Sequence, residues 1–161
     1  MHITLWTSLS VFLADQISKL IVVQFLNLKD IGAIDVFPPF FQLRMAWNTG
    51  VNFGLFSSFD MRWVLVTLAL VITVAVLFWV KRDGGSKWVF FSAGLLVGGA
   101  IGNVIDRLIY GAVADFLNFS CCGINNPYAF NVADIAVFGG AIGLVLFHSD
   151  NEHPKEKSKR S

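Results

Sequence analysis

The strongest constraint on this chain is the gathering of its apolar residues into four blocks. They cover about residues 3–26, 63–80, 88–108 and 130–147. A helix that rises about 1.5 Å per residue needs about 20 residues to cross a hydrocarbon layer roughly 30 Å thick. A helix also satisfies its own backbone hydrogen bonds, which the bilayer interior cannot do. The sequence therefore predicts an all-α integral membrane protein with four transmembrane helices.

The composition agrees with lipid as the surrounding solvent. Hydrophobic residues make up 55% of the 161 residues and charged residues 14%, against about 25% charged residues in an ordinary soluble domain. The net charge of +1 gives no reason to expect nucleic acid as a partner. The histidines (His2, His148 and His153) and the adjacent Cys121 and Cys122 lack the spacing of a metal site. No metal and no cofactor are expected.

Asp15 and Lys19 lie inside the first apolar block. No basic segment precedes this block, so we interpret it as a transmembrane helix rather than a cleaved signal peptide. The two charged residues are four positions apart and share one helical face, where they can form an ion pair. From the residues alone, this pair fits a role in the fold as well as a role at a site.

Two polar segments separate the apolar blocks. In residues 27–62 the alternation of Phe41, Leu43 and Met45 favours short strands, which predicts a small extramembrane β platform. Residues 109–129 form a second polar connection. The third apolar block is rich in glycine, which lets membrane helices approach closely; because these glycines lie inside an apolar run, we interpret them as packing residues rather than a phosphate-binding loop.

The basic residues predict the orientation in the membrane. Lys81, Arg82 and Lys87 follow the second block, and the 149–161 tail carries four more basic residues. Lysine and arginine are enriched in cytoplasmic loops, so both termini are expected in the cytoplasm. Residues 27–62 and 109–129 then share the opposite face. Residues 1–148 are expected to form a single membrane domain, and the tail to be disordered.

Asp115 and Asp134 are the best candidates for chemistry. They lie on either side of a turn back into the fourth block, which allows their carboxylates to meet. Two facing carboxylates cannot both ionise readily, so they share a proton, and one acts as a base on water while the other acts as an acid. Membrane carboxylates also serve in proton relays, ion sites and structural pairs.

Two other polar side chains near these blocks also need partners. Arg107 offers five fixed donors, which suit a carboxylate or a substrate carbonyl. Asn131 precedes Asp134 by three residues, so it either hydrogen-bonds a carboxylate or peptide group or caps the fourth helix.

Two other classes of protein fit the same composition. A small transporter or proton-coupled channel would use Asp15, Asp115 and Asp134 in an ion pathway with Arg107 as counter-charge, and would show flux without proteolysis. A noncatalytic assembly protein would pair its buried charges with a partner's helix. Its Asp→Asn variants would disturb complex formation rather than turnover.

Five short segments, taken in order, resemble the lipoprotein signal peptidase family, also called signal peptidase II. They are residues 15–19 (DQISK), 48–54 (NTGVNFG), 98–107 (GGAIGNVIDR), 113–116 (VADF) and 130–134 (FNVAD). Each segment alone is weakly specific, but five in the family's order on a chain of this length are strongly specific. Two departures are small: Ala114 replaces a larger aliphatic residue, and the segment around Cys121 looks particular to this chain.

The resemblance implies an intramembrane aspartic endopeptidase that cuts a prolipoprotein signal peptide before a diacylglyceryl-modified cysteine. Asp115 and Asp134 match the family's catalytic pair. By the same likeness, the residues that line the site or hold the substrate are Asn48, Gly50, Asn103, Arg107 and Asn131, supported by Asp15 and Lys19. A short interfacial helix is implied within residues 109–129, beside the β platform.

The resemblance also implies the partners and the location. The substrate is a lipid-modified prolipoprotein, reached among membrane lipids, and a cyclic peptide of the globomycin type is the implied inhibitor. The protein is expected to be a monomer of the cytoplasmic (inner) membrane, with its active site near the outer leaflet. A lipidated cysteine is anchored at the bilayer interface, so both carboxylates must lie at that depth.

Overall fold

The computed structural model describes residues 1–50, 61–121, 123 and 126–149; for residues 148 and 149 it describes the backbone alone. Residues 51–54 of the second family segment, and all but the first residue of the predicted disordered tail, lie outside the described residues. So does Cys122.

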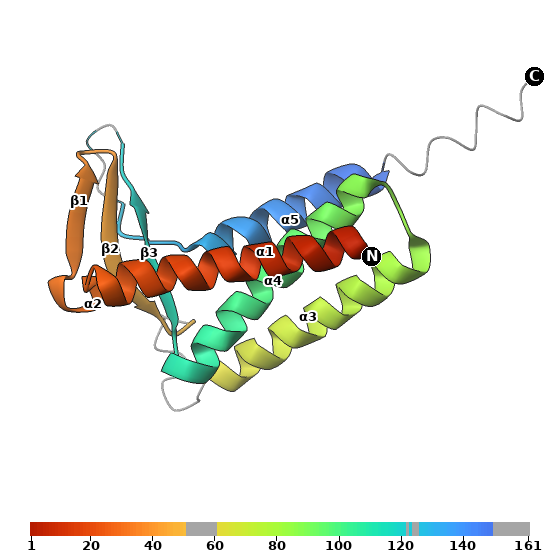
Figure 1. Ribbon diagram of the computed structural model, residues 1–161, viewed down its shortest axis with the longest axis horizontal. Helices are drawn as coiled ribbons and strands as arrows, with labels where there is room; N and C mark the ends of the chain where they lie inside the picture. Colours follow the sequence, from red (N-terminus) through yellow and green to blue (C-terminus); the bar gives the residue numbers. More distant parts are fainter. Residues whose placement is uncertain (51–60, 122, 124–125, 150–161) are drawn as a thin grey trace, which may run out of the picture.

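Helices make up most of the described chain (Figure 1). Their bounds are α1 (His2–Lys19), the π-helix η1 (Leu20–Phe25) that continues it, α2 (Leu28–Ile31), α3 (Met61–Asp83), α4 (Lys87–Tyr110) and α5 (Val132–Ser149). The central helix is α4, which packs against α1, α3 and α5. The N-terminus, the α3–α4 connection and the end of α5 lie at one end of the bundle, and a small sheet lies at the other.

This sheet has three antiparallel strands in the order β1 (Ala33–Phe37), β2 (Phe41–Asn48) and β3 (Val113–Phe119). The first two confirm the short strands predicted within residues 27–62. The described residues between 111 and 131 contain a strand and no helix, whereas an interfacial helix was expected there. The difference has a physical reason: β3 pairs with the second edge of β2, whose N–H and C=O groups need partners. Phe116 of β3 packs on Leu28 and Leu43 in a small core under the sheet.

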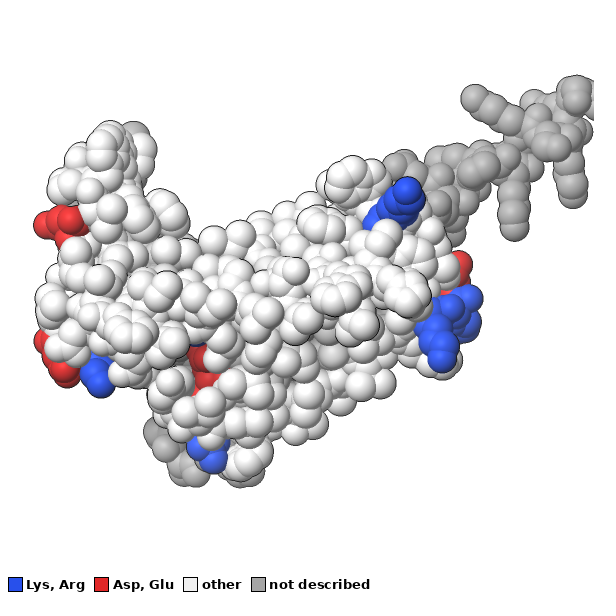
Figure 2. All heavy atoms as spheres, in the orientation of Figure 1, with Lys and Arg blue, Asp and Glu red and all other residues white. Residues whose placement is uncertain are grey.

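Three helices of the described chain are long and apolar enough to cross a membrane: His2–Phe25, Met61–Asp83 and Lys87–Tyr110. The apolar part of α5, Val132–Phe147, is shorter. Figure 2 shows charged side chains gathered toward the two ends of the molecule, with an almost uncharged surface between them. The protein is a multi-pass membrane protein, and the charges exposed on the face drawn in Figure 2 avoid the depth that lipid tails would occupy.

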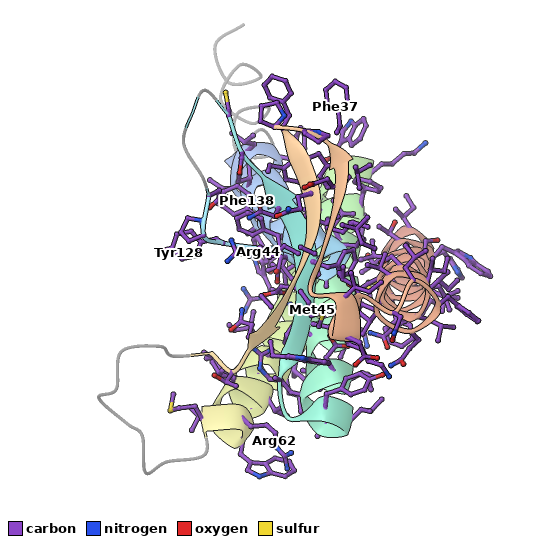
Figure 3. All side chains as sticks on the ribbon, turned by 90° about the vertical axis from the view of Figure 1, so that its left-hand side faces the viewer. Phe37, Arg44, Met45, Arg62, Tyr128 and Phe138 are labelled. Atoms are coloured by element: carbon purple, nitrogen blue, oxygen red, sulfur yellow. The ribbon has the colours of Figure 1, made fainter. Side chains whose placement is uncertain are left out.

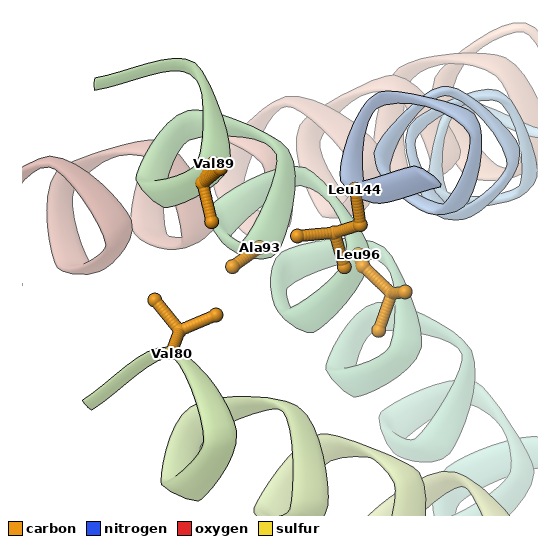
Figure 4. Close-up of a cluster of buried hydrophobic side chains, with 5 residues drawn as sticks. All are labelled: Val80, Val89, Ala93, Leu96 and Leu144. Carbon is orange, nitrogen blue, oxygen red and sulfur yellow. The ribbon is translucent and has the colours of Figure 1, made fainter. Parts of the chain in front are cut away.

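Glycines set the close approach of the helices, as the sequence predicts. A Cβ on Gly98 would lie 2.9 Å from the Ser8 Cα of α1, and a Cβ on Gly99 would collide with the Ala133 carbonyl of α5. At the end of the bundle away from the sheet, a core of buried hydrophobic side chains also lies between α3, α4 and α5 (Figure 4). This core consists of Val80, Val89, Ala93, Leu96 and Leu144. Close glycine contacts and buried apolar side chains thus both hold α4 against its neighbours.

Candidate active site

Asp115 lies on β3 and is buried, with 3% of its surface exposed. Each carboxylate oxygen accepts a hydrogen bond from an asparagine side chain. Asn131 Nδ2 donates to Oδ1 at 2.6 Å, and Asn48 Nδ2, at the end of β2, donates to Oδ2 at 3.1 Å. Asp115 is thus in a strand, and two neutral donors fix its orientation.

Asp134 lies in the first turn of α5 and is partly exposed. Asn103 Nδ2 of α4 donates to its Oδ1 at 2.9 Å. The backbone N–H of Asn131 donates to its Oδ2 at 3.4 Å, while Asp134 N donates back to Asn131 Oδ1 at 2.7 Å. This reciprocal pair is a capping box at the start of the helix.

Asn131 links the two aspartates. It is fully buried, and its side chain caps α5 through Oδ1 and binds the Asp115 carboxylate through Nδ2. The same Nδ2 lies 3.3 Å from Asn103 Oδ1. Both roles that the sequence left open for Asn131 are therefore filled. The structure brings Asp115 and Asp134 to one site, as their sequence positions allow.

Burial sets the protonation of Asp115. Removal from water and, to a smaller extent, the nearby charge of Asp134 together raise the pKa of this carboxyl to about 6, against the opposing effect of the Asn48 and Asn131 amides and the charge of Lys19. A carboxyl group in this state holds a proton to higher pH than an ordinary aspartate. The pair can therefore present one acid and one base together.

Gly50 and Arg107 complete the polar side of the site. Gly50 N donates to Asn48 Oδ1 at 2.9 Å, which turns the NH₂ of Asn48 toward Asp115; the φ of +108° at Gly50 favours glycine. Arg107 Nη1 donates to the Asn103 carbonyl at 3.3 Å. Its buried Nε has no hydrogen-bond partner within the described part of the chain, so this donor is available to a ligand.

An apolar groove begins at Asp134 and runs along α5. Its volume is about 690 Å³. Its lining consists of Phe119, Phe130, Asp134, Ile135, Val137, Phe138 and Ala141. Figure 3 looks onto the sheet end of the molecule and labels Phe138. One carboxylate of the pair therefore faces a space suited to an apolar ligand.

Asp15 and Lys19 do not touch either aspartate through a hydrogen bond. Lys19 Nζ lies 2.7 Å from Asp15 Oδ2 and 2.8 Å from Asp106 Oδ2, and all three residues are buried. Gln16 Nε2 also donates to Asp15 at 3.1 Å and Asp106 at 3.0 Å. The sequence predicts the Asp15–Lys19 pair but not its third member, because Asp106 lies far along the chain and no local pattern connects it with this pair.

Together, the helical bundle and the linked carboxylates define a membrane protein with a pair of aspartates, joined through Asn131, at one end of its apolar region. The Signal peptidase (SPase) II family model matches residues 7–149. The chain belongs to the signal peptidase II family, whose members are proteases that process lipoproteins.

Two relatives and one solved structure illustrate the similarity. A lipoprotein signal peptidase of Methylobacterium sp. (strain 4-46) is 40% identical over 144 residues, which cover 87% of this chain and 84% of the relative. One from Burkholderia multivorans is 41% identical over 140 residues, covering 86% and 82%. A solved bacterial membrane enzyme has the same fold, with a TM-score of 0.79 and 24% identity over 97% of this chain and 93% of that one.

Proposed function

We propose that the protein is an intramembrane aspartic endopeptidase that removes the signal peptide from diacylglyceryl-modified prolipoproteins, cutting before the lipidated cysteine. The observation that carries this proposal is the pair Asp115 and Asp134, joined through Asn131, whose side chain donates to the Asp115 carboxylate and accepts from Asp134 N. Membership of the signal peptidase II family supports the substrate class.

In this proposal the pair holds one proton. The ionised carboxylate takes a proton from water, whose oxygen attacks the scissile carbonyl carbon, while the protonated carboxyl donates its proton to the carbonyl oxygen. The tetrahedral intermediate then collapses: the carboxyl that took the water proton gives it to the cysteine nitrogen, the C–N bond breaks, and the other carboxylate takes a proton back from a hydroxyl group of the intermediate. The free Nε of Arg107 supports a role in binding a peptide carbonyl, since a buried donor without a partner is costly.

We place the sheet end of the molecule at the outer face of the membrane. The opposite end carries Lys81, Arg82 and Lys87, in keeping with a cytoplasmic location for the basic loop and both termini. With α5 as a fourth, shorter span, Asp134 in its first turn lies near the outer interface, at the depth where a lipid-anchored cysteine is held. The apolar groove along α5 lets an apolar part of the substrate approach from the lipid.

The direct test is cleavage of a defined substrate by the purified protein in detergent. Diacylglyceryl-modified prolipoprotein should be cut at the peptide bond before the modified cysteine, with an undiminished rate in a metal chelator. The same prolipoprotein without the lipid should be cut at least about 100-fold more slowly. Absence of cleavage by a folded protein, together with ion flux in proteoliposomes, would support the transporter instead.

The raised pKa of Asp115 predicts the pH dependence. The singly protonated pair is the active form, and Asp115 titrates at about pH 6. As the pH rises above 6 the shared proton is lost, so kcat/KM should fall and approach a tenfold decrease per pH unit. Initial rates measured between pH 5 and 8 give this decrease in kcat/KM. A flat profile across that range would contradict the two-carboxylate mechanism.

A further inference from the structure

The buried ion cluster, which we define as Asp15, Lys19 and Asp106, contacts the backbone beside both aspartates of the pair. Asp106 Oδ2 accepts a hydrogen bond from Ala114 N at 3.2 Å, and Ala114 immediately precedes Asp115. Asp15 Oδ1 accepts one from Ala133 N at 2.9 Å, and Ala133 immediately precedes Asp134. Each acidic residue of the cluster therefore accepts a hydrogen bond from the backbone N–H of the residue just before one aspartate of the pair.

Lys19 joins Asp15 and Asp106, since its ammonium group lies within 2.8 Å of both of their carboxylates. The cluster consists of two acidic side chains and one basic side chain and is almost completely buried. A buried ion pair is often no more stabilising than apolar residues of the same size. A gain in stability therefore does not account for this cluster. Precise positioning of the two aspartates does, because displacing a reacting group by about 1 Å can lower the rate roughly 100-fold.

We propose that Lys19 and Asp106 are positioning residues for hydrolysis: with Asp15, they hold the backbone N–H groups of Ala114 and Ala133 and so fix the spacing of Asp115 and Asp134. This inference rests on the proposed function for its kinetic consequence, but the backbone contacts are measurable without it. None of the three residues touches the reacting atoms.

Asp106→Asn and Asp106→Ala are a matched pair that separates the backbone contact from the charge. Both remove one negative charge, but asparagine keeps an oxygen that can accept from Ala114 N, and alanine does not. We expect kcat for Asp106→Ala to be at least about tenfold below that of Asp106→Asn, with KM within about twofold. Leu96→Ala, in the core at the other end, is the control for a general loss of stability.

Lys19→Met is the second variant, and it keeps the proposal testable if Asp106→Ala does not fold. It leaves both acceptors but removes the group that joins them, so both backbone contacts should loosen. Asp106→Ala should loosen only the contact at Ala114.

Amide hydrogen exchange measures directly how well the N–H groups of Ala114 and Ala133 are protected by these hydrogen bonds. The chain contains three Val-Ala peptide bonds, which end at Ala75, Ala114 and Ala133. If valine is labelled with ¹³C at its carbonyl and alanine with ¹⁵N, an NMR experiment that detects only ¹³C–¹⁵N peptide bonds selects these three amides in the protein in micelles. Ala75, within α3, is an internal control. Faster exchange at Ala114 in Asp106→Ala, and at both Ala114 and Ala133 in Lys19→Met, is expected.

The outcomes distinguish the two proposals. Equal kcat in Asp106→Ala and Asp106→Asn, or losses that follow thermal stability as in Leu96→Ala, would overturn the positioning role. Unchanged exchange at Ala114 and Ala133 would overturn it independently of any activity. If the parent cuts no prolipoprotein, the proposed function fails, while the exchange pattern still decides whether the cluster holds this backbone.

Discussion

Asp115→Asn and Asp134→Asn are each expected to lower kcat by at least about 1,000-fold while leaving the protein folded. Each asparagine keeps the shape of the aspartate but can neither take nor give the proton that hydrolysis requires, and acid–base catalysis by one positioned group contributes about 10²–10⁴-fold. The loss should be similar in the two variants and in their double variant, because the two groups act as one unit.

Thermal stability separates this loss from unfolding. The pKa of Asp115 is raised, so its folded form binds a proton more tightly than the unfolded chain does, and the charged group opposes folding increasingly from about pH 4 up to about pH 6 and fully above that. Replacing it with a neutral amide relieves this cost near pH 7, although the new NH₂ must face Asn48 or Asn131. The melting temperature in detergent should therefore stay within a few degrees.

Asp35→Asn is the matched control. Asp35 is an exposed aspartate of β1 that accepts a hydrogen bond only from Gln42 Nε2, among the contacts described for it. Its replacement should leave kcat within about twofold. Undiminished cleavage by either Asp115→Asn or Asp134→Asn would remove the two-aspartate mechanism.

The sequence alone anticipated much of the fold and the pairing of the aspartates. The long helices follow from the apolar blocks, because block length and bilayer thickness are directly related. The strands of residues 27–62 follow from period-two alternation. In contrast, β3 was not anticipated, since a seven-residue strand with almost every side chain buried has no alternation to reveal it, and its formation depends on the distant edge of β2.

The contacts around the pair show the same limit. Asn131 was recognised because a cap and a helix start are local features, three residues apart. No partner for Asp106 follows from the sequence, because its contacts with Gln16, Lys19 and Ala114 join three separate elements. Local patterns predict single elements well, while the positioning of the site depends on contacts that only the packed bundle creates.

Gly140→Val is expected to destabilise the protein by more than about 3 kcal/mol, which corresponds to a fall of roughly 10 °C in melting temperature for a chain of this size. A Cβ at Gly140 would lie 2.5 Å from Leu96 N and 2.6 Å from the Ser92 carbonyl, both backbone atoms of α4. Backbone atoms of a packed helix cannot move aside as a flexible side chain can, so α5 itself must shift.

Gly139→Val is the control because a Cβ there meets nothing within 4 Å. Both variants place the same β-branched residue in the same helix and differ only in the face that receives it. Gly139→Val should melt within about 3 °C of the parent. Since Asp134 is in the first turn of α5, the folded fraction of Gly140→Val should also lose activity. Equal melting temperatures for the two variants would show that the close α4–α5 approach contributes little to stability.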